Sequence, residues 1–426
     1  MGDADSGGRP DGSGTERAAG QRGDDPEPRD ATGDHPGDAT AATGEPAVEL
    51  AERVQAVPPS GIRRFFELVE ETEDVISLAV GEPNFSAPWA AREAAIDSLE
   101  RGRTAYTANR GRRELREAVA EHVTRYDLSY DPDDEILVTT GVSEALDLAM
   151  RAVVDPGDTV AVVRPSYVSY APTVTFAGGE VLSVPTRAAD DFRLTPAALE
   201  AAGADRADAL VYSYPNNPTG AVLGSDDLDE VAAFAREHDL TVFADEVYAA
   251  LTYAGDHESI ATRPGMRERT VVFNGFSKAY AMTGLRLGYA MGPAHLIEGM
   301  NRVHQYTMLS APTTAQYAAV EALRSCDDEV AEMRRQYDRR RRFVLTRLAE
   351  MDMEPFEARG AFYVFPPCPG DDEAFAEDLL REQNVAVVPG SVFGPGGEGH
   401  LRMCYATGMD ELREAMNRLE AFLDGR

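Results

Sequence analysis

Short runs of apolar and β-branched residues alternate along this chain with segments of amphipathic, helical pattern. The strand-like runs are EILVTT (135–140), TVAVV (159–163), ALVYSYP (209–215), TVFADEVY (241–248) and TVVFNGF (270–276). Helical patterns such as SEALDLAMRAVV and SDDLDEVAAFAREHD stand between them. Apolar strands that alternate with helices predict an α/β fold, in which a mostly parallel sheet is covered by helices on both faces.

The two ends of the chain have different patterns. Residues 1–46 contain ten Gly, eleven Asp or Glu and four Arg but no Val, Ile, Leu, Phe, Tyr or Trp, which predicts a disordered acidic tail. Near the other end, a long charged helical pattern is followed by strand-like AFYVFP and VAVVPG and a closing helix. We therefore predict a segment 47–86 that contributes to a small domain, a large domain over 87–325, and the C-terminal small α/β domain over 326–426.

Composition excludes several classes of function. The 426 residues carry 41 basic and 74 acidic side chains, a net charge of −33, which argues against binding to nucleic acid or to anionic membranes. No run approaches the length of a membrane span, and no apolar signal segment opens the sequence, so we expect a cytoplasmic protein. The three cysteines include no CxxC, so no metal site is indicated. An acidic surface is typical of a protein from a salty cytoplasm, where salt screens charge repulsion.

The basic run DRRRR at 338–342 could suggest a nucleic-acid patch. Acidic residues, Glu329, Glu332 and Asp338, interleave with it at helical spacing. This pattern favours an ion-paired helix face.

Lysine is almost absent from this chain. Lys278 is the single lysine, and the other 40 basic residues are arginine. A lone lysine is usually a solvated one. Here arginine serves wherever a cation faces water, and arginine does not lose its proton. A desolvated lysine can lose its proton and form a Schiff base with a carbonyl, so this lysine is a candidate amine nucleophile.

Other candidate side chains follow the strands, at the edge where α/β folds bind ligands. Val142 and Ser143 begin a helix, which can bind an anion, although Ser143 could equally be an N-cap. Tyr167 could stack on a planar ring or lie in the core. Asn217 belongs to the string NNPTG, which also has the composition of a turn.

The last two strands add a carboxylate and a guanidinium. Asp245 stands at the end of TVFAD with Tyr248 three residues on, and a buried carboxylate there needs a partner, unless it caps the next helix. Arg286 follows Lys278 by eight residues. An amine, a carboxylate, a stacking aromatic and an anion site together fit pyridoxal 5′-phosphate (PLP), which binds through a lysine Schiff base and an Asp at its pyridinium nitrogen.

These residues belong to a longer series of strings that resembles the fold-type I, class I/II aminotransferases. The strings are SGIRRFF, SLAVGEPNF, YTANRGRRELREAV, NNPTGAV, ADEVY, NGFSKAYAMTGLRLGY, GAFYVFP, VAVVPGSVFG and GEGHLRMCYATG, from about residue 60 to 410. They are most similar to the I-gamma subgroup of aspartate and aromatic aminotransferases. The resemblance implies transfer of an amino group between amino acids and 2-oxo acids, with 2-oxoglutarate and glutamate as one pair and aspartate or an aromatic amino acid in the other. A PLP lyase or decarboxylase is the alternative.

The resemblance also implies roles for the matching residues. Lys278 would form the Schiff base and act as the catalytic base, Asp245 would pair with the pyridine nitrogen, and Tyr248 and Asn217 would hydrogen-bond the 3′ oxygen of the ring. The remaining cofactor-binding residues would stack on the ring or hold the phosphate: Tyr167, Val142, Ser143, Ser277 and Arg286.

For the substrate, Arg402 would grip the α-carboxylate bidentately and Gly81 would let the substrate approach the backbone, with Asn217 close by. Arg110 is a candidate for a second carboxylate, and Arg63 a weaker one. Tyr106 would reach the phosphate in a neighbouring subunit, which implies a homodimer with shared active sites.

Two positions depart from the family pattern. Many relatives have Ser or Thr as a phosphate ligand three residues before the lysine, where this chain has Gly275. Leu285 replaces a tryptophan that is common in relatives.

Overall fold

The structure, a computed structural model, describes residues 48–62 and 74–426. The predicted tail at residues 1–46 and the candidate Arg63 lie outside the described residues. Residues Leu50–Arg426 form one compact unit.

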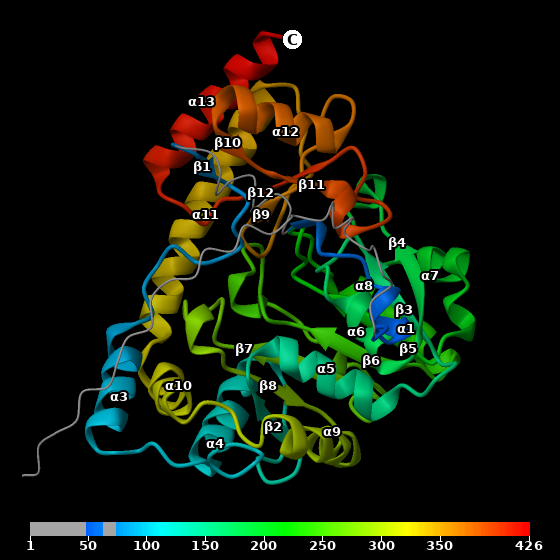
Figure 1. The fold of residues 1–426 in the computed structure, drawn as a ribbon, viewed down its shortest axis with the longest axis vertical. Helices are drawn as coiled ribbons and strands as arrows, with labels where there is room; N and C mark the ends of the chain where they lie inside the picture. Colours follow the sequence, from blue (N-terminus) through cyan, green and yellow to red (C-terminus); the bar gives the residue numbers. More distant parts are fainter. Residues whose placement is uncertain (1–47, 63–73) are drawn as a thin grey trace, which may run out of the picture. The chain divides into compact units, whose positions relative to one another are not determined.

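A seven-stranded sheet forms the centre of this unit, in the order β2-β8-β7-β6-β5-β3-β4 (Figure 1). β8 pairs antiparallel with β2 and β7, and the other pairings are parallel. The predicted α/β fold is confirmed, although the patterns did not predict β4 or β8. The strands are β2 (Ile136–Thr139), β3 (Thr159–Arg164), β4 (Glu180–Pro185), β5 (Ala209–Ser213), β6 (Thr241–Asp245), β7 (Thr270–Gly275) and β8 (Gly288–Met291).

Helices cover both faces of this sheet. On the first face, Val211 of β5 and Phe243 of β6 pack with α5 (Val142–Val153), α6 (Tyr170–Ala177) and α9 (Ala294–Thr307). On the second face, Tyr212 of β5 and Ala244 of β6 pack with α7 (Pro196–Ala202) and α8 (Ser225–Glu237). Neighbouring residues of one strand therefore face opposite layers, because strand side chains alternate in direction.

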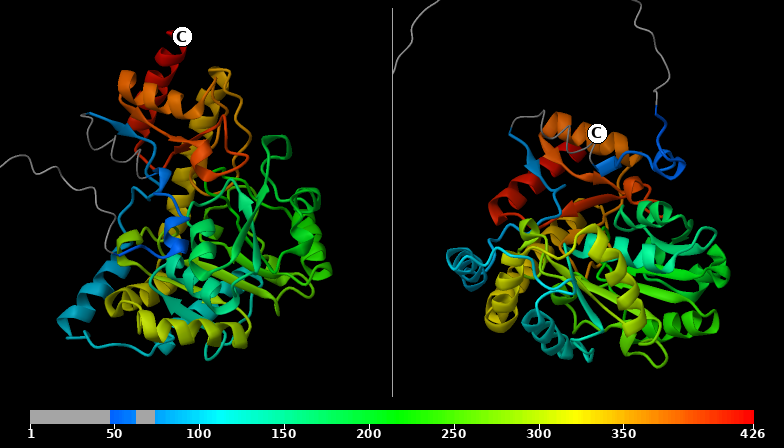
Figure 2. Two further views of the ribbon diagram at one scale, coloured as in Figure 1. Left: turned by 45° about the vertical axis from the view of Figure 1, so that its right-hand side comes forward. Right: turned by 60° about the horizontal axis from the view of Figure 1, so that its bottom comes forward.

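The C-terminal elements form a second group above the large sheet, in orange and red in Figures 1 and 2. β1 (Ile76–Ser77) pairs in parallel with β10 (Val385–Ala386), so part of the predicted 47–86 segment joins this group. The domain boundaries themselves stay a prediction. The other elements are β9 (Tyr363–Val364), β11 (Val388–Pro389) and β12 (Leu401–Cys404), which form an antiparallel sheet, and α11 (Asp327–Glu350), α12 (Asp372–Gln383) and α13 (Met409–Asp424).

The remaining helices are α1 (Glu52–Gln55), α3 (Trp89–Glu100), α4 (Arg113–His122) and α10 (Thr313–Ser325), with the short 3₁₀ helices η1 (Val123–Tyr126), η2 (Ala188–Asp190), η3 (Ala204–Arg206), η4 (Ala249–Leu251), η5 (Ile260–Thr262), η6 (Thr283–Leu285) and η7 (Gly390–Phe393). In the described ranges, no helix has both the length and the apolar character needed to cross a membrane.

The arginine run on α11 forms ion pairs along the helix. Arg341 lies 2.8 Å and Arg342 3.2 Å from carboxylate oxygens of Asp338, and Arg335 lies 2.6 Å from Glu332. These contacts agree with the ion-paired face that the spacing favours.

Candidate active site

A cavity of about 960 Å³ lies at the carboxyl ends of the central strands. Within the described residues, eleven of the thirteen candidate site residues line it, and Tyr106 and Arg110 do not. The eleven are Gly81, Val142, Ser143, Tyr167, Asn217, Asp245, Tyr248, Ser277, Lys278, Arg286 and Arg402.

Lys278 follows β7 and is partly buried in this cavity. Its Nζ donates a hydrogen bond of 2.7 Å to the carbonyl oxygen of Gly81 and lies 5.7 Å from the centre of the Tyr248 ring. Burial lowers the pKa of the ammonium group from 10.5 to about 8, because the charged form loses its hydration. The neutral, nucleophilic amine is therefore much more populated near pH 7 than it is for a lysine at the surface.

Asp245 ends β6 and is 5% exposed. The hydroxyl of Tyr170 donates to its Oδ2 at 2.6 Å, and the backbone N–H of Val247 donates to its Oδ1 at 3.1 Å. Burial raises the pKa of this carboxyl to about 6. Asp245 caps no long helix, since the short η4 helix begins only at Ala249. A cation beside it, such as a protonated pyridine nitrogen, would stabilise its charged form.

Arg402 lies on β12 and is buried, yet it forms no ion pair with any described acidic residue. Its Nη1 donates to Asn217 Oδ1 at 3.1 Å and its Nη2 to the carbonyl oxygen of Ala79 at 2.5 Å, while its Nε has no partner. A buried guanidinium is costly without an anion. The geometry therefore suits a carboxylate from a ligand.

The string NNPTG forms a turn and also contributes a side chain to the cavity. Asn216 Oδ1 accepts a hydrogen bond of 3.1 Å from the backbone N–H of Thr219, so Asn216 stabilises the turn. The neighbouring Asn217 lines the cavity and contacts Arg402.

The start of α5 forms the other end of the cavity. Gly141 is the N-cap residue with φ of 79°, so Ser143 lies inside the first turn, where backbone N–H groups have no partner within a helix. A Cβ atom at Gly141 would lie 2.9 Å from Nη2 of Arg286. Arg286 is exposed, donates to the carbonyl oxygen of Thr283 at 3.0 Å, and forms no ion pair with a described residue. A helix N-terminus beside a guanidinium suits a phosphate group.

Tight packing explains the glycine at position 275. Gly275 on β7 pairs with Gly288 on β8, and a Cβ atom at 275 would lie 2.9 Å from the Cα of Gly288 and 3.1 Å from the carbonyl oxygen of Leu287. Neither serine nor threonine fits here without a shift of the backbone. That Ser277 or Ser143 binds the phosphate in its place stays a prediction.

Two tyrosines of the site were missed from sequence. The hydroxyl of Tyr363 lies 2.9 Å from that of Tyr248, and its ring centre lies 4.8 Å from Arg402 Cζ. Tyr170 holds Asp245. Tyr363 belongs to the string GAFYVFP, and Tyr170 follows Tyr167 by three residues. Each therefore lies in or near a sequence feature that could have identified it as a site residue.

The structure does not bring the other candidates into this cavity. Tyr106 is 81% exposed on the loop after α3. Arg110 donates to Glu298 Oε2 at 2.5 Å and to the carbonyl oxygen of Asp134 at 2.9 Å, so its guanidinium is already occupied within the chain.

The residues present fit PLP. The lining contains three cations, Lys278, Arg286 and Arg402, and none of them is ion-paired among the described residues. PLP would bring a carbonyl and a phosphate, and an amino acid would bring a carboxylate. Asp245 would meet the ring nitrogen, and Tyr167 offers a ring for stacking.

Comparison with known proteins gives one family. The profile of aminotransferase class I and II matches residues 73–419. YugH of Bacillus subtilis is 48% identical over 88% of this chain and 98% of its own length, and an aspartate aminotransferase of Pyrococcus abyssi is 44% identical over 88% and 98%. A solved aromatic aminotransferase from Pyrococcus horikoshii, 44% identical, has a TM-score of 0.81 over 86% of this chain and 99% of that one. The chain therefore belongs to the class I and II aminotransferases, PLP-dependent enzymes that transfer an amino group from an amino acid to a 2-oxo acid.

Proposed function

We propose that this enzyme takes a neutral, preferably aromatic, amino acid as donor more readily than aspartate, with 2-oxoglutarate as acceptor. The observation that carries the proposal is the set of charges in the catalytic cavity. The cavity has three cations, and PLP with an amino acid would supply one partner group for each of them: the cofactor carbonyl, the cofactor phosphate and the substrate α-carboxylate. In the described lining, the other charged residues are the anions Glu82 and Asp245.

The remaining lining suits an apolar side chain. Ile62, Val80, Leu146 and Val168 contribute aliphatic surface, and Tyr363 contributes an aromatic ring. The β-carboxylate of aspartate would be desolvated here without a counter-ion, which is costly. The longer side chain of glutamate lets its carboxylate extend toward solvent, so we expect glutamate to be accepted better than aspartate.

In this proposal each residue acts on a stated atom. Bound PLP supplies an electron sink for the electrons of the Cα–H bond. Lys278 Nζ removes the proton from the substrate Cα and then delivers it to the C4′ atom of the cofactor. Asp245 keeps the pyridine nitrogen protonated, and Arg402 orients the α-carboxylate so that the Cα proton faces the lysine.

A donor panel with excess 2-oxoglutarate tests this proposal. We expect kcat/KM for phenylalanine or tyrosine to exceed that for aspartate by at least about tenfold, which corresponds to about 1.4 kcal/mol. Glu82→Gln removes the anion and should raise kcat/KM for aspartate while leaving that for phenylalanine nearly unchanged. Equal or better use of aspartate by the wild-type enzyme would show that the substrate class is wrong. Turnover without an acceptor would indicate a lyase or decarboxylase.

We propose further that the enzyme is a homodimer with shared active sites. Exposed apolar residues support this proposal: Trp89, Ile96 and Leu99 on α3, Tyr106 after it, Tyr306 in the last turn of α9, and Met308 and Leu309 after α9. Asn109 donates to the carbonyl oxygen of Leu309 at 2.6 Å, which links the loop after α3 to the segment after α9. Exposed apolar patches often mark protein interfaces.

Mixing two inactive variants tests the shared site. Lys278→Ala lacks the amine and Tyr106→Ala lacks the side chain that we assign to the neighbouring site. Subunit exchange between them would create one intact site per mixed dimer, so we expect part of the activity to return. A monomer in solution, or no recovery after verified exchange, would contradict the proposal.

The acidic composition supports one more proposal, a salt-adapted cytoplasmic enzyme. The net charge of −33 implies repulsion between acidic groups, which salt screens. We expect low salt to loosen the fold. Circular dichroism and activity that stay unchanged at about 0.1 M salt, where screening reaches only about 10 Å, would refute this.

A further inference from the structure

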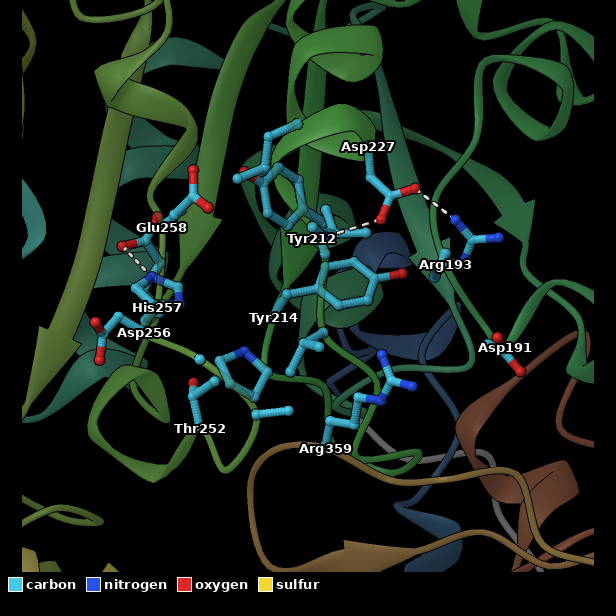
Figure 3. Close-up of a pocket in the computed structure, with 18 residues that line it drawn as sticks. Asp191, Arg193, Tyr212, Tyr214, Asp227, Thr252, Asp256, His257, Glu258 and Arg359 are labelled. Carbon is cyan, nitrogen blue, oxygen red and sulfur yellow. Dashed lines mark hydrogen bonds and ion pairs between the residues drawn. The ribbon is translucent and has the colours of Figure 1, made fainter.

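Arg340 on α11 is a buried cation without an acidic partner in the described part of the chain. It is 6% exposed and forms no ion pair with any described residue. Its neighbour Arg341 is paired with an acid, and so is Arg193 in the cavity behind β5 and β6, where it lies 2.7 Å from Asp227 (Figure 3). A buried charge without a counter-ion is costly, which points to a role beyond the stability of the fold.

The guanidinium of Arg340 contacts one short segment before α3. Its Nη1 donates to Asn84 Oδ1 at 2.7 Å, and its Cζ lies 5.1 Å from the centre of the Phe85 ring. The Phe85 ring also meets the ring of Tyr337, three residues before Arg340, at a distance of 5.3 Å between ring centres. Figure 1 shows the segment between β1 and α3 running beside α11. Arg340 therefore fastens this segment to α11 through a charged hydrogen bond and aromatic contacts.

The segment that Arg340 holds also contacts two cations of the catalytic cavity. The carbonyl oxygen of Gly81 accepts from Lys278 Nζ at 2.7 Å, and the carbonyl oxygen of Ala79 accepts from Arg402 Nη2 at 2.5 Å. Two carbonyl groups only two residues apart therefore help to orient the lysine and the arginine. A small shift of this segment would displace both, and catalytic groups tolerate little displacement.

The two ends of this segment are fastened in different ways. At its start, β1 pairs with β10, and the carbonyl oxygen of Leu78 accepts from the backbone N–H of Cys404 at 2.8 Å. Further on, residues 82–87 form no backbone–backbone hydrogen bond with any described residue. The contact between Asn84 and Arg340 therefore fixes the end of the segment that no sheet holds.

We propose that Arg340 is a positioning residue: by holding Asn84, it keeps the carbonyl oxygen of Gly81 in place for Lys278. Arg340 is not among the described residues that line the catalytic cavity, so it acts through the segment and not on the substrate. The inference rests on the role proposed above for Lys278.

The test compares two exposed asparagines that each accept a hydrogen bond from an arginine of α11. Asn84→Ala removes the acceptor of Arg340, and the control Asn417→Ala removes the acceptor of Arg347, which donates at 3.0 Å outside the catalytic cavity. Neither exchange alters a charge, so both variants should unfold at the wild-type concentration of urea. We expect kcat to fall about tenfold in Asn84→Ala and to stay unchanged in the control.

The pH dependence of cofactor uptake gives a readout that a purely structural role would not change. The carbonyl oxygen of Gly81 stabilises the ammonium form of Lys278, so loss of this contact should lower the pKa of the amine. The midpoint of the pH profile for PLP uptake by cofactor-free Asn84→Ala should therefore lie below the wild-type midpoint, by about half a pH unit. Asn84→Asp restores an acceptor for Arg340 and should bring kcat and the midpoint back toward the wild-type values.

Arg340→Met tests the other side of the contact. Methionine replaces a desolvated, unpaired charge with an apolar side chain of similar length, so the fold should not be weakened. We expect kcat to fall about as much as in Asn84→Ala. The double variant should lose no more activity than either single variant, because both remove the same contact.

Three results would overturn the proposal: kcat and an uptake midpoint in Asn84→Ala equal to those of Asn417→Ala, a loss of kcat that Asn84→Asp does not restore, or additive losses in the double variant. Lys278→Ala in the same uptake assay separates this failure from that of the proposed function. Attachment of PLP that persists in Lys278→Ala would overturn both proposals. Wild-type behaviour of Asn84→Ala beside a Lys278→Ala variant that attaches no PLP would overturn only the role of Arg340.

Discussion

The surface of α11 and the catalytic cavity treat positive charge in opposite ways. On α11, the exposed Arg335 and Arg342 form ion pairs with acids three and four residues away. In the cavity, Lys278, Arg286 and Arg402 form none with any described residue. The chain has 74 acidic residues for 41 basic ones, so acids are plentiful. We therefore expect anionic ligands to bind at these three cavity cations, whereas the paired arginines stabilise a solvated helix face.

The largest effect should come from changing the single lysine. Lys278→Arg keeps the charge but removes the amine that can lose its proton, and we expect kcat to fall by at least about 10⁴-fold. The matched control is Arg342→Lys on α11, which exchanges the same two residue types at a surface ion pair. Its activity should be unchanged and its stability should stay within about 0.5 kcal/mol. If Arg342→Lys lost as much activity as Lys278→Arg, the proposed difference between the cavity lysine and the arginines on α11 would be wrong.

Asp245→Asn should affect activity and stability in opposite directions. Without a carboxylate at the ring nitrogen, we expect turnover to fall by about 10³-fold, comparable to the loss of one strong electrostatic contact in a catalytic site. Near-normal turnover would contradict the role of Asp245.

The stability effect of the same variant follows from the pKa. Burial raises the pKa of Asp245 from 3.8 to about 6 in the folded enzyme without cofactor. The folded state therefore binds the proton more tightly than the unfolded state, and stability is lost as pH rises from about 4 to about 6. At pH 8 the cofactor-free Asn variant should be more stable, by up to about 3 kcal/mol. Urea unfolding measures this difference, and a less stable variant would contradict it.

Arg402→Gln tests the cation assigned to the substrate. It should lower kcat/KM by about 10²-fold, because the α-carboxylate loses a charged, bidentate partner. Cofactor affinity should change little, since Arg402 lies at β12 and not at the start of α5. A decrease in kcat/KM of less than threefold would contradict this role of Arg402. A variant that mainly loses affinity for the cofactor would contradict it as well.

The pH dependence of cofactor loading should be the smallest effect. A pKa of about 8 means that the neutral amine of Lys278 increases with pH up to about 8 and then reaches a plateau. The rate at which the cofactor-free enzyme takes up PLP should rise about tenfold per pH unit below 8 and level off above it. A rate that continues to rise to pH 10 would indicate an ordinary, solvated lysine.

The sequence predicted the fold type and eleven of the residues that line the cavity, because strand-end chemistry is local. Asp245 ends a recognisable strand, and Lys278 and Asn217 follow one by three and four residues. It failed where the determinant is a contact between distant segments. Tyr363 meets Tyr248 across 115 residues, and β8 was not recognised as a strand although it lies between β2 and β7. The reason for Gly275 likewise depends on its partner Gly288, which only the sheet register reveals.

The central claim is that Lys278 carries the cofactor. Because the chain has a single lysine, reduction of the PLP-loaded enzyme with borohydride, followed by digestion and mass spectrometry, tests it directly. We expect one phosphopyridoxyl group per chain, attached to the peptide that contains Lys278. Cofactor that stays unattached after reduction, or that is attached at the N-terminal amine instead, would contradict it.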